Sequence, residues 1–135
     1  MRIDPTTLDI QILAPLFAAF EESGARLLYV GGCIRNAVMG VVATDIDLTS
    51  DAEPDQMRQI AQAHGIKVVD TGAAYGTLTF LMGGKSYEIT TFRKDVTTDG
   101  RHAEVAFGTS LEEDAARRDF TMNALYAESS GHVID

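Results

Sequence analysis

The 135 residues are 45% hydrophobic, which is enough to bury one ordinary core, so we expect a single compact domain over 1–135. The net charge of −9 argues against this segment gripping a nucleic-acid backbone by itself, because that affinity comes largely from Lys and Arg side chains that neutralise phosphates. The single cysteine, Cys33, excludes an intramolecular disulfide. The sequence shows neither a leader segment nor an apolar stretch near the ~20 residues that a membrane span needs. We therefore expect a cytoplasmic protein with no membrane partner.

The first half of the chain alternates predicted helices and strands. Apolar residues recur at helical spacing at the start, with Pro15 as a point where that helix can kink. A short apolar run ending in a glycine pair then predicts a strand followed by a helix, and alternating acidic and apolar residues predict the next strand. The predicted elements are a helix over 8–20, a strand from Leu27 to Val30, a helix from Ile34 to Met39, a strand from Asp45 to Thr49 and a helix from Pro54 to His64.

The second half contains a strong hairpin signal at Gly83-Gly84, which separates two strand patterns. The polar, glycine-bearing stretch from Arg93 to Ser110 has little periodicity and predicts a long mobile loop. The remaining predicted elements are strands over Lys67 to Val69, Thr77 to Met82 and Lys85 to Phe92, helices over Leu111 to Arg117 and Phe120 to Leu125, and a strand around Tyr126. Because a helix crossover favours parallel pairing and a hairpin requires antiparallel pairing, we predict an α/β fold with a mixed β-sheet flanked by helices.

Two aspartates, Asp45 and Asp47, are separated by one apolar residue. In a strand this spacing puts both carboxylates on one face, while Ile46 and Leu48 face the core. Like charges this close repel, and a divalent cation such as Mg²⁺, which prefers one or two carboxylates plus substrate phosphates, relieves the repulsion. Acid-apolar-acid triplets also occur on many exposed strands, so the pattern needs partner motifs before it indicates a metal site.

A glycine pair, Gly31-Gly32, stands between a predicted strand and a predicted helix, with Arg35 soon after. Backbone N–H groups at such a helix start favour a phosphate, and glycine lets the backbone approach it closely. The Arg35 guanidinium could bind a phosphate oxygen bidentately. The stretch lacks the Lys-Ser/Thr ending of a P-loop. A tight turn without function is the alternative interpretation.

A third carboxylate, Glu88, lies in a predicted strand among apolar residues and threonines. One interpretation is that it faces outward as an ordinary surface residue, which is the usual case. The other is that it lies beside Asp47 and acts on the metal or on an attacking hydroxyl. The sequence position alone leaves both open.

A cluster near the C-terminus combines Arg117, Arg118, Asp119 and Asn123. The arginines could hold a nucleotide triphosphate, and Asp119 or Asn123, four residues apart on one helix face, could hold its ribose. Asp119 could equally be a helix cap and Arg117 a surface residue. Five of the eleven basic residues fall between 93 and 118, so a local cationic patch could still meet a triphosphate despite the acidic net charge.

The order and spacing of these motifs resemble a known family. Gly31-Gly32, twelve intervening residues, Asp45-Ile46-Asp47-Leu48 and then Tyr87-Glu88-Ile89 look like the signature of the DNA polymerase β-type nucleotidyltransferase superfamily. More narrowly, the stretches LYVGGCIRNAVMG, TDIDLTS, YEITTFRKD and DGRHAEVAFGTSLEEDAARRDFTMNALY resemble the class II tRNA nucleotidyltransferase (CCA-adding enzyme) and bacterial poly(A) polymerase family. The similarity runs from about Leu27 to Asp135.

The resemblance implies a catalytic head domain that uses ATP and CTP to extend a tRNA 3′ end and releases pyrophosphate. It assigns two Mg²⁺ ions to Asp45 and Asp47, and the third carboxylate position to Glu88. It matches Gly31, Gly32 and Arg35 to the phosphate-contacting turn, and the stretch from Arg93 to Ser110 to a flexible loop. The RRD-x-x-x-N motif, which contacts phosphate and ribose, matches the following residues: Arg117, Arg118, Asp119 and Asn123.

Two departures from the family pattern matter. Asn36 stands where many relatives carry Asp, which puts a supporting salt bridge in doubt but not the metal site. The neck domain that selects the base and the helical domains that grip tRNA are not found within these residues, so we expect a truncated head that binds nucleotides without selecting a base. A poly(A) polymerase, an A-only or C-only enzyme and a non-catalytic nucleotide-binding module are the alternatives; the last predicts a lost carboxylate, and all three carboxylates are present.

Overall fold

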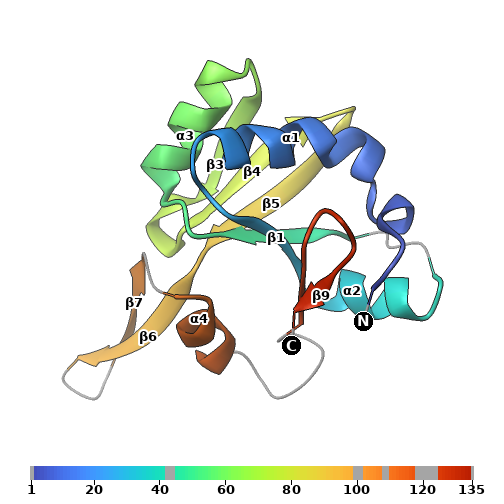
Figure 1. Cartoon of the computed structure of the whole chain (residues 1–135). Coiled ribbons are helices and arrows are strands. Elements are labelled where there is room, and N and C mark those ends of the chain that lie inside the picture. The colour runs from blue at the N-terminus through green and yellow to red at the C-terminus, as the bar shows by residue number, and fades with distance from the viewer. Residues whose placement is uncertain (1, 42–44, 99–101, 108–109, 118–124, 135) are drawn as a thin grey trace.

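A computed structural model of the chain describes residues 2–41, 45–98, 102–107, 110–117 and 125–134 (Figure 1). The helices in this part of the chain are η1 (Pro5–Leu8), α1 (Ile10–Glu22), α2 (Gly32–Val38), α3 (Pro54–Ala63), η2 (Ala73–Tyr75) and α4 (Leu111–Arg117). The strands are β1 (Leu27–Val30), β2 (Asp47–Ser50), β3 (Lys67–Gly72), β4 (Thr77–Met82), β5 (Lys85–Thr91), β6 (Arg93–Thr98), β7 (His102–Phe107), β8 (Tyr126–Ala127) and β9 (Val133–Ile134). Among the described residues, no helix has the length and apolar character that crossing a membrane requires.

Seven of the described strands form one sheet in the order β3-β4-β5-β2-β1-β8-β9. β2 and β5 run parallel, and the other neighbouring pairs run antiparallel. The predicted mixed sheet flanked by helices is therefore confirmed. A helix crossover was expected to favour parallel pairing, but α2 joins antiparallel strands. The chain leaves β1 at Val30 and begins β2 at Asp47, which is the residue paired with Val30.

The main core lies between the sheet and two helices, α1 and α3, which cover the same face (Figure 1). Leu13, Leu16 and Phe20 of α1 are fully buried, and the Phe20 ring lies 5.9 Å from that of Phe80. Burial of each such side chain contributes about 1.5–3 kcal/mol. The helix begins two residues later than predicted and continues through Pro15 to Glu22.

The N-terminal helices are attached to the sheet by polar contacts as well as by packing. Asp9, between η1 and α1, has a φ of 54°, and its carboxylate accepts hydrogen bonds from the Tyr87 hydroxyl at 2.9 Å and the Lys85 ammonium at 3.0 Å. Tyr29 donates a hydrogen bond to the Leu8 carbonyl at 2.9 Å. Burial, followed by the contact with Asp9, raises the pKa of Tyr87, so this hydroxyl remains a donor at neutral pH.

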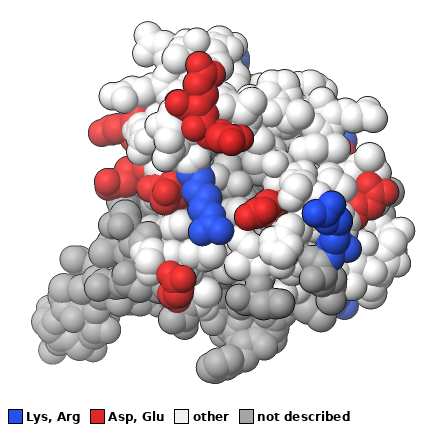
Figure 2. Space-filling view, viewed as in Figure 1, with Lys and Arg blue, Asp and Glu red and all other residues white. Residues whose placement is uncertain are grey.

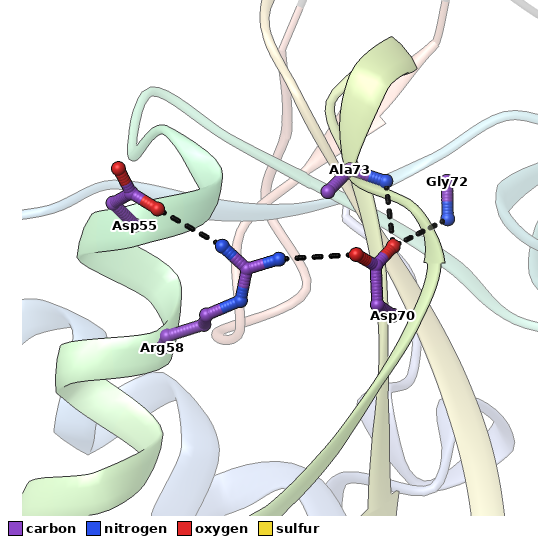
Figure 3. A network of polar contacts seen from close by, with 5 residues as sticks. All are labelled: Asp55, Arg58, Asp70, Gly72 and Ala73. Atoms are coloured by element: carbon purple, nitrogen blue, oxygen red, sulfur yellow. Dashed lines mark hydrogen bonds and ion pairs between the residues drawn. The ribbon is translucent and has the colours of Figure 1, made fainter.

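A polar network joins α3 to the turn after β3 (Figure 3). The Arg58 guanidinium contacts the carboxylates of Asp55 at 2.9 Å and Asp70 at 3.2 Å. The Asp70 carboxylate also accepts hydrogen bonds from the backbone N–H groups of Gly72 and Ala73. Because all three charged side chains are substantially exposed, each ion pair contributes at most about 1 kcal/mol, and the main effect of the network is to fix the shape of the turn.

The opposite face of the sheet carries a smaller apolar cluster formed by Leu28, Val30, Phe92 and Tyr126. Leu28 and Val30 alternate with Leu27 and Tyr29 of the main core, as the two-residue period of a strand requires. Helix α4 packs against this cluster through Leu111 and Ala115. The sheet is therefore covered by α1 and α3 on one face and, over β1 and β8, by α4 on the other.

The prediction of a long loop from Arg93 to Ser110 was wrong. Residues 93–98 and 102–107 form β6 and β7, a two-stranded antiparallel ribbon that projects from the main sheet (Figure 1). In β7, Ala103, Val105 and Phe107 alternate with His102 and Glu104, a strand pattern that the polar composition of the whole stretch obscured. Asp99-Gly100, between the two strands, is a dipeptide typical of hairpin connections, and together with this alternation it was the available signal.

The remaining predicted elements agree with the structure to within a few residues. The predicted hairpin between β4 and β5 is present, and Gly83 and Gly84 both have positive φ, as a tight hairpin turn requires. Helix α2 begins at Gly32 rather than at Ile34. The helix over Leu111 to Arg117 and the strand at Tyr126 are confirmed. Most of the predicted helix from Phe120 to Leu125 lies outside the described residues.

Candidate active site

The site is built around one row of paired residues that crosses the sheet. Tyr126 of β8 is opposite Val30 of β1, Val30 is opposite Asp47 of β2, and Asp47 is opposite Glu88 of β5. Paired residues in a sheet direct their side chains to the same face. The row therefore puts two carboxylates next to the apolar cluster on which α4 packs.

Asp45 and Asp47 are both exposed, while Ile46 and Leu48 are 6% and 1% exposed and belong to the core. The predicted alternation of acidic and apolar residues is therefore present in the structure. β2 begins at Asp47, and Asp45 lies in a bend before the strand, so the strand starts two residues later than predicted. The core anchors the apolar residues and leaves both carboxylates at the surface.

Glu88 was left with two interpretations, and its location favours the one that involves Asp47. It is exposed in β5 between Tyr87 and Ile89, which are buried, and it lies in register with Asp47 on the parallel neighbour. Adjacent strands are about 4.8 Å apart, so two like charges face solvent side by side. Such a pair is destabilising unless a cation or a donor group compensates it.

The donor chemistry around Asp47 fits a hard divalent cation better than a soft one. The candidate ligands are carboxylate oxygens, which Mg²⁺ prefers, with no thiolate or imidazole among them. Among the residues that the structure describes, no three acidic, His or Cys side chains converge closely enough to hold a metal ion. A Mg²⁺ ion held by these carboxylates would complete its coordination with water or substrate phosphate oxygens.

The predicted phosphate turn lies at the end of β1. Gly31 has φ 83° and ψ −140°, a conformation almost restricted to glycine, and its N–H donates to the Leu125 carbonyl at 3.0 Å. Gly32 begins α2 and is exposed, and no atom of the described residues lies within 4 Å of where a Cβ would stand on either glycine. Arg35 is exposed on α2. Within the described part of the chain, the turn has open space in front of its backbone, beside the strand end opposite Asp47.

Cys33 lies beneath this turn and is 2% exposed. Its Sγ is 3.4 Å from the Val30 carbonyl and 4.0 Å from the Asp47 carbonyl. Burial raises the pKa of the Cys33 thiol to about 11. The thiol therefore stays protonated at neutral pH and buried, which excludes it as a nucleophile for this site.

The arginine motif is described only at its start. Arg117 is the last residue of α4, and α4 packs on the same sheet face that carries Asp47 and Glu88. The other predicted members of this motif, Arg118, Asp119 and Asn123, lie outside the described residues. The motif thus begins at the end of a helix that covers the face of the carboxylates.

One contact next to the site was missed at the level of sequence. Asp114 of α4 is 0% exposed, and its carboxylate accepts a hydrogen bond from the Tyr126 hydroxyl at 2.5 Å. The available signal was an acid three residues after Leu111 and next to Ala115, on the face of α4 that is otherwise apolar.

A separate cavity of about 360 Å³ lies at the other end of β1, where Phe17, Arg26 and Leu27 are among its lining residues. Leu27 is opposite Ser50, at the far end of β2 from Asp47. The candidate carboxylates therefore do not line this cavity.

Surface charge differs between regions of the molecule. Figure 2 shows acidic side chains gathered on the side where α3 lies, and Asp51, Glu53, Asp55 and Asp70 are exposed there. This side would repel a nucleic-acid backbone. A polyanionic ligand must approach from another side.

Comparison with known proteins gives a consistent result. A family model described as "Poly A polymerase head domain" matches residues 27–135. The chain is 40% identical over 124 residues to the human mitochondrial CCA tRNA nucleotidyltransferase 1, covering 91% of this chain and 29% of that protein.

Two solved structures are also similar. The CCA-adding enzyme of Bacillus stearothermophilus in complex with CTP matches with a TM-score of 0.78 and 35% identity, over 93% of this chain and 29% of that one. A tRNA nucleotidyltransferase complexed with a primer tRNA and an incoming ATP analog matches with a TM-score of 0.65 and 26% identity, over 92% of this chain and 34% of that one. The chain thus spans about a third of the length of the proteins it matches.

Proposed function

The chain belongs to the poly A polymerase head domain family, and from that premise we propose that it is the nucleotidyl-transferring head of an enzyme that adds CCA to tRNA 3′ ends. The substrates would be CTP, ATP and a tRNA lacking its 3′ end, and pyrophosphate would be released. The observation that carries this proposal is the register of Asp47 and Glu88 on one exposed sheet face, beside the strand end where Gly31-Gly32 opens α2.

Asp45 and Asp47 would hold Mg²⁺ in this proposal, because their carboxylates are exposed, adjacent and fixed by buried neighbours. The metal, when bound, would neutralise phosphate charge and make the primer 3′-hydroxyl a better nucleophile. Glu88, next to Asp47, would either share in holding the metal or orient the attacking hydroxyl.

The triphosphate would lie between the glycine turn and the end of α4. Among the described residues, none fills the space before the Gly32 backbone at the start of α2, and Arg35 is exposed on the same helix. In this proposal Arg117, Arg118, Asp119 and Asn123 would contact phosphate and ribose. In the reaction, the 3′-hydroxyl oxygen bonds to the α-phosphorus, the bond from that phosphorus to the bridging oxygen breaks, and pyrophosphate leaves.

Base selection is not assigned to any described residue, because the candidate site consists of carboxylates, a glycine turn and arginines, which recognise phosphates and metal rather than base edges. The RNA would not be bound by the acidic side near α3. We therefore propose that this chain binds MgATP and MgCTP with similar affinity. Tight RNA binding and discrimination between bases would need further protein surface.

The first test measures binding of MgATP and MgCTP to the chain by isothermal titration calorimetry, with Asp47→Asn as the variant and Glu53→Gln as a matched control. Glu53 is an exposed acid before α3, so its neutralisation changes the net charge equally but leaves the site intact. We expect both nucleotides to bind, Asp47→Asn to weaken binding at least tenfold, and Glu53→Gln to have little effect. No binding of either nucleotide would contradict the proposal.

A second test supplies Mg²⁺, a tRNA lacking its 3′ CCA and labelled CTP, ATP or both. Two cytidines followed by one adenosine, abolished by Asp47→Asn, would establish CCA addition. The family description also favours a second candidate, a poly(A) polymerase, and long adenosine tails would identify it. Addition of a single base would indicate an A-only or C-only enzyme with the same head chemistry.

A further inference from the structure

Two threonines next to the candidate site form a hydroxyl pair on the face of the sheet that carries Glu88. Thr90 follows Glu88 by two residues in β5, and Thr77 of β4 is its register partner. Their hydroxyl oxygens are 3.0 Å apart, and both residues are half-buried. Their chain neighbours Leu78 and Ile89 belong to the main core, so the two threonine side chains lie on the opposite face of the sheet, with Glu88.

This pair of hydroxyl groups can still bind a hydroxyl group of a ligand. Each threonine hydroxyl has one proton to donate and lone pairs that accept. One proton is used in the bond between Thr77 and Thr90, of which either can be the donor. Within the described residues, this leaves the second proton and further lone pairs for a ligand. The pair can therefore donate a hydrogen bond to a sugar hydroxyl and accept one from it.

The strand directions place the pair on the far side of the carboxylates from the glycine turn. Gly31 follows Val30 at the end of β1, and Val30 is opposite Asp47, where β2 begins. β5 runs parallel to β2, so the step from Glu88 to Thr90 leads away from the turn by about 7 Å. The glycine turn, the carboxylates and the threonine pair therefore follow one another along the strands.

The geometry of the proposed reaction gives this far side to the primer. In the proposed function the triphosphate lies at the glycine turn, so pyrophosphate leaves toward the turn. In an in-line displacement, the attacking 3′-hydroxyl approaches the α-phosphorus from the opposite side. Helix α4 packs on Leu28 and Val30 and so covers the route over β1. The terminal ribose of the primer would therefore lie over β5 and β4.

We propose that Thr77 and Thr90 bind the 2′-hydroxyl of the terminal ribose of the primer, and that they make the site prefer an RNA end to a DNA end. The 2′-hydroxyl is adjacent to the attacking 3′-hydroxyl, and it is the group by which a protein distinguishes RNA from DNA. The inference rests on the proposed function, because it takes an RNA 3′ end as the nucleophile. It holds whether CTP, ATP or both are added.

A cross-strand pair of threonines also stabilises a sheet without binding anything, and valine substitutions separate the two roles. Valine keeps the branched shape and the strand preference of threonine but lacks the hydroxyl group. A purely structural role predicts that Thr90→Val changes the melting temperature and leaves the preference for an RNA end as it is. A binding role predicts that the preference changes in a protein that is still folded.

The test measures the initial rate at which the full chain transfers labelled CTP and ATP to two primers with Mg²⁺ present. One primer is a tRNA lacking its 3′ CCA, and the other is the same tRNA with a 2′-deoxy terminal nucleotide, at equal subsaturating concentrations. The parent should use the ribose-ended primer about tenfold faster, the factor that one hydrogen bond of ordinary strength produces.

The variants should divide according to whether they keep the hydroxyl group. Thr90→Val and Thr77→Val should lose most of the preference, because transfer to the ribose-ended primer slows while transfer to the deoxy-ended primer stays the same. Thr90→Ser, which retains a hydroxyl group, should keep the preference. Circular dichroism establishes that each variant is folded at the assay temperature.

Thr71→Val is the matched control. Thr71 and Thr79 form a second threonine pair, with hydroxyl oxygens 2.9 Å apart. Thr71 lies in β3, the outermost strand, which is separated from β5 by β4. Thr71→Val should therefore leave both transfer rates, and hence the preference, unchanged.

Folded Thr90→Val and Thr77→Val proteins with the parental preference would overturn the inference and leave the proposed function intact. A parent that uses both primers equally fast would have the same meaning. A parent that binds MgCTP in calorimetry but extends neither primer would show that these threonines form no working primer site, which also overturns the inference. A parent that binds neither MgATP nor MgCTP would overturn the proposed function, and the inference with it.

Discussion

Asp47 and Glu88 are register partners on adjacent parallel strands, β2 and β5, and both side chains are exposed. β2 and β5 are also the only parallel neighbours among the described strands of the main sheet. The pairing brings together two acids that are far apart in the sequence. Two adjacent carboxylates repel each other, and a bound cation would relieve this repulsion.

This repulsion can be measured through Glu88→Gln. The substitution keeps the size of the side chain and removes one of two facing charges, so the free energy of unfolding at low salt should rise by a few tenths of a kcal/mol. The gain should shrink in about 1 M salt, where the Debye length is about 3 Å. Urea unfolding at both salt concentrations tests this. A variant that is less stable than the parent at low salt would show that Glu88 is already compensated by a donor group.

The same variant should lose part of its response to metal. If the two acids hold Mg²⁺ together, the cation stabilises the folded parent by binding it and not the unfolded chain. The increase in melting temperature on addition of MgCl₂ should therefore be smaller for Glu88→Gln than for the parent. An equal increase would exclude Glu88 from metal binding and leave it the role of orienting the hydroxyl.

Gly31 and Gly32 allow backbone strain to be separated from ligand contact. Gly31→Ala forces an alanine into φ 83°, ψ −140°, and should destabilise the fold by about 1–3 kcal/mol. Gly32 has no positive φ, and its Cβ would meet no atom of the described residues within 4 Å. Alanine is also favoured over glycine in a helix. Gly32→Ala should leave the free energy of unfolding unchanged or slightly raised.

Nucleotide affinity should follow a different order from stability at these two positions. A methyl group on Gly32 projects from the exposed start of α2, where the triphosphate is proposed to approach the backbone. Gly32→Ala should therefore weaken MgATP binding severalfold in calorimetry, although the protein is fully folded. Unchanged affinity would mean that the turn serves the fold alone.

The features predicted correctly from the sequence are those encoded by neighbouring residues within one segment. The alternation that directs Asp45 and Asp47 outward and Ile46 inward is local and was predicted, as was the Gly83-Gly84 hairpin. The placement of Glu88 beside Asp47 depends on which strands become neighbours, and strand order is not encoded in either segment alone. Glu88 was therefore identified as a candidate without a decision between its two roles.

The two failures have different causes. The β6–β7 ribbon was obscured by the polar, glycine-bearing composition of the stretch, although Ala103, Val105 and Phe107 alternate with His102 and Glu104 in β7. Asp114 is buried because α4 packs on β8, which comes later in the chain. A sequence pattern marks an acid on an apolar helix face as an anomaly, and only the tertiary structure supplies the Tyr126 hydroxyl that explains it.

Substitutions at Thr91 and Thr49 can be compared to measure how much an unsatisfied buried hydroxyl lowers the free energy of unfolding. Both residues are fully buried. The Thr91 hydroxyl has no hydrogen-bond partner among the residues that the structure describes, whereas the Thr49 hydroxyl donates to the Thr90 carbonyl at 2.7 Å. Valine keeps the branched shape in both cases. Thr91→Val should raise the free energy of unfolding by about 1 kcal/mol, and Thr49→Val should lower it by about the same amount. Equal destabilisation in urea would indicate that an ordered water satisfies Thr91.

Alkaline pH should destabilise the protein partly through Cys33. Burial raises the pKa of this thiol from its ordinary value of 9.0 to about 11 in the folded chain, so above pH 9 the unfolded chain loses the proton first. Because the unfolded state then binds fewer protons than the folded state, the free energy of unfolding falls as pH rises from 9 to 11. The raised pKa values of the buried Tyr29 and Tyr87 act in the same direction at higher pH.

Cys33→Ala isolates the thiol contribution, because alanine fits the same buried position without a titrating group. The variant should be less stable than the parent at neutral pH, owing to the small cavity, but its stability should fall less steeply between pH 9 and 11. Urea unfolding at several pH values gives both quantities. Parallel pH profiles for parent and variant would mean that Cys33 ionises equally easily in the folded and unfolded chains, contrary to its burial beneath the glycine turn.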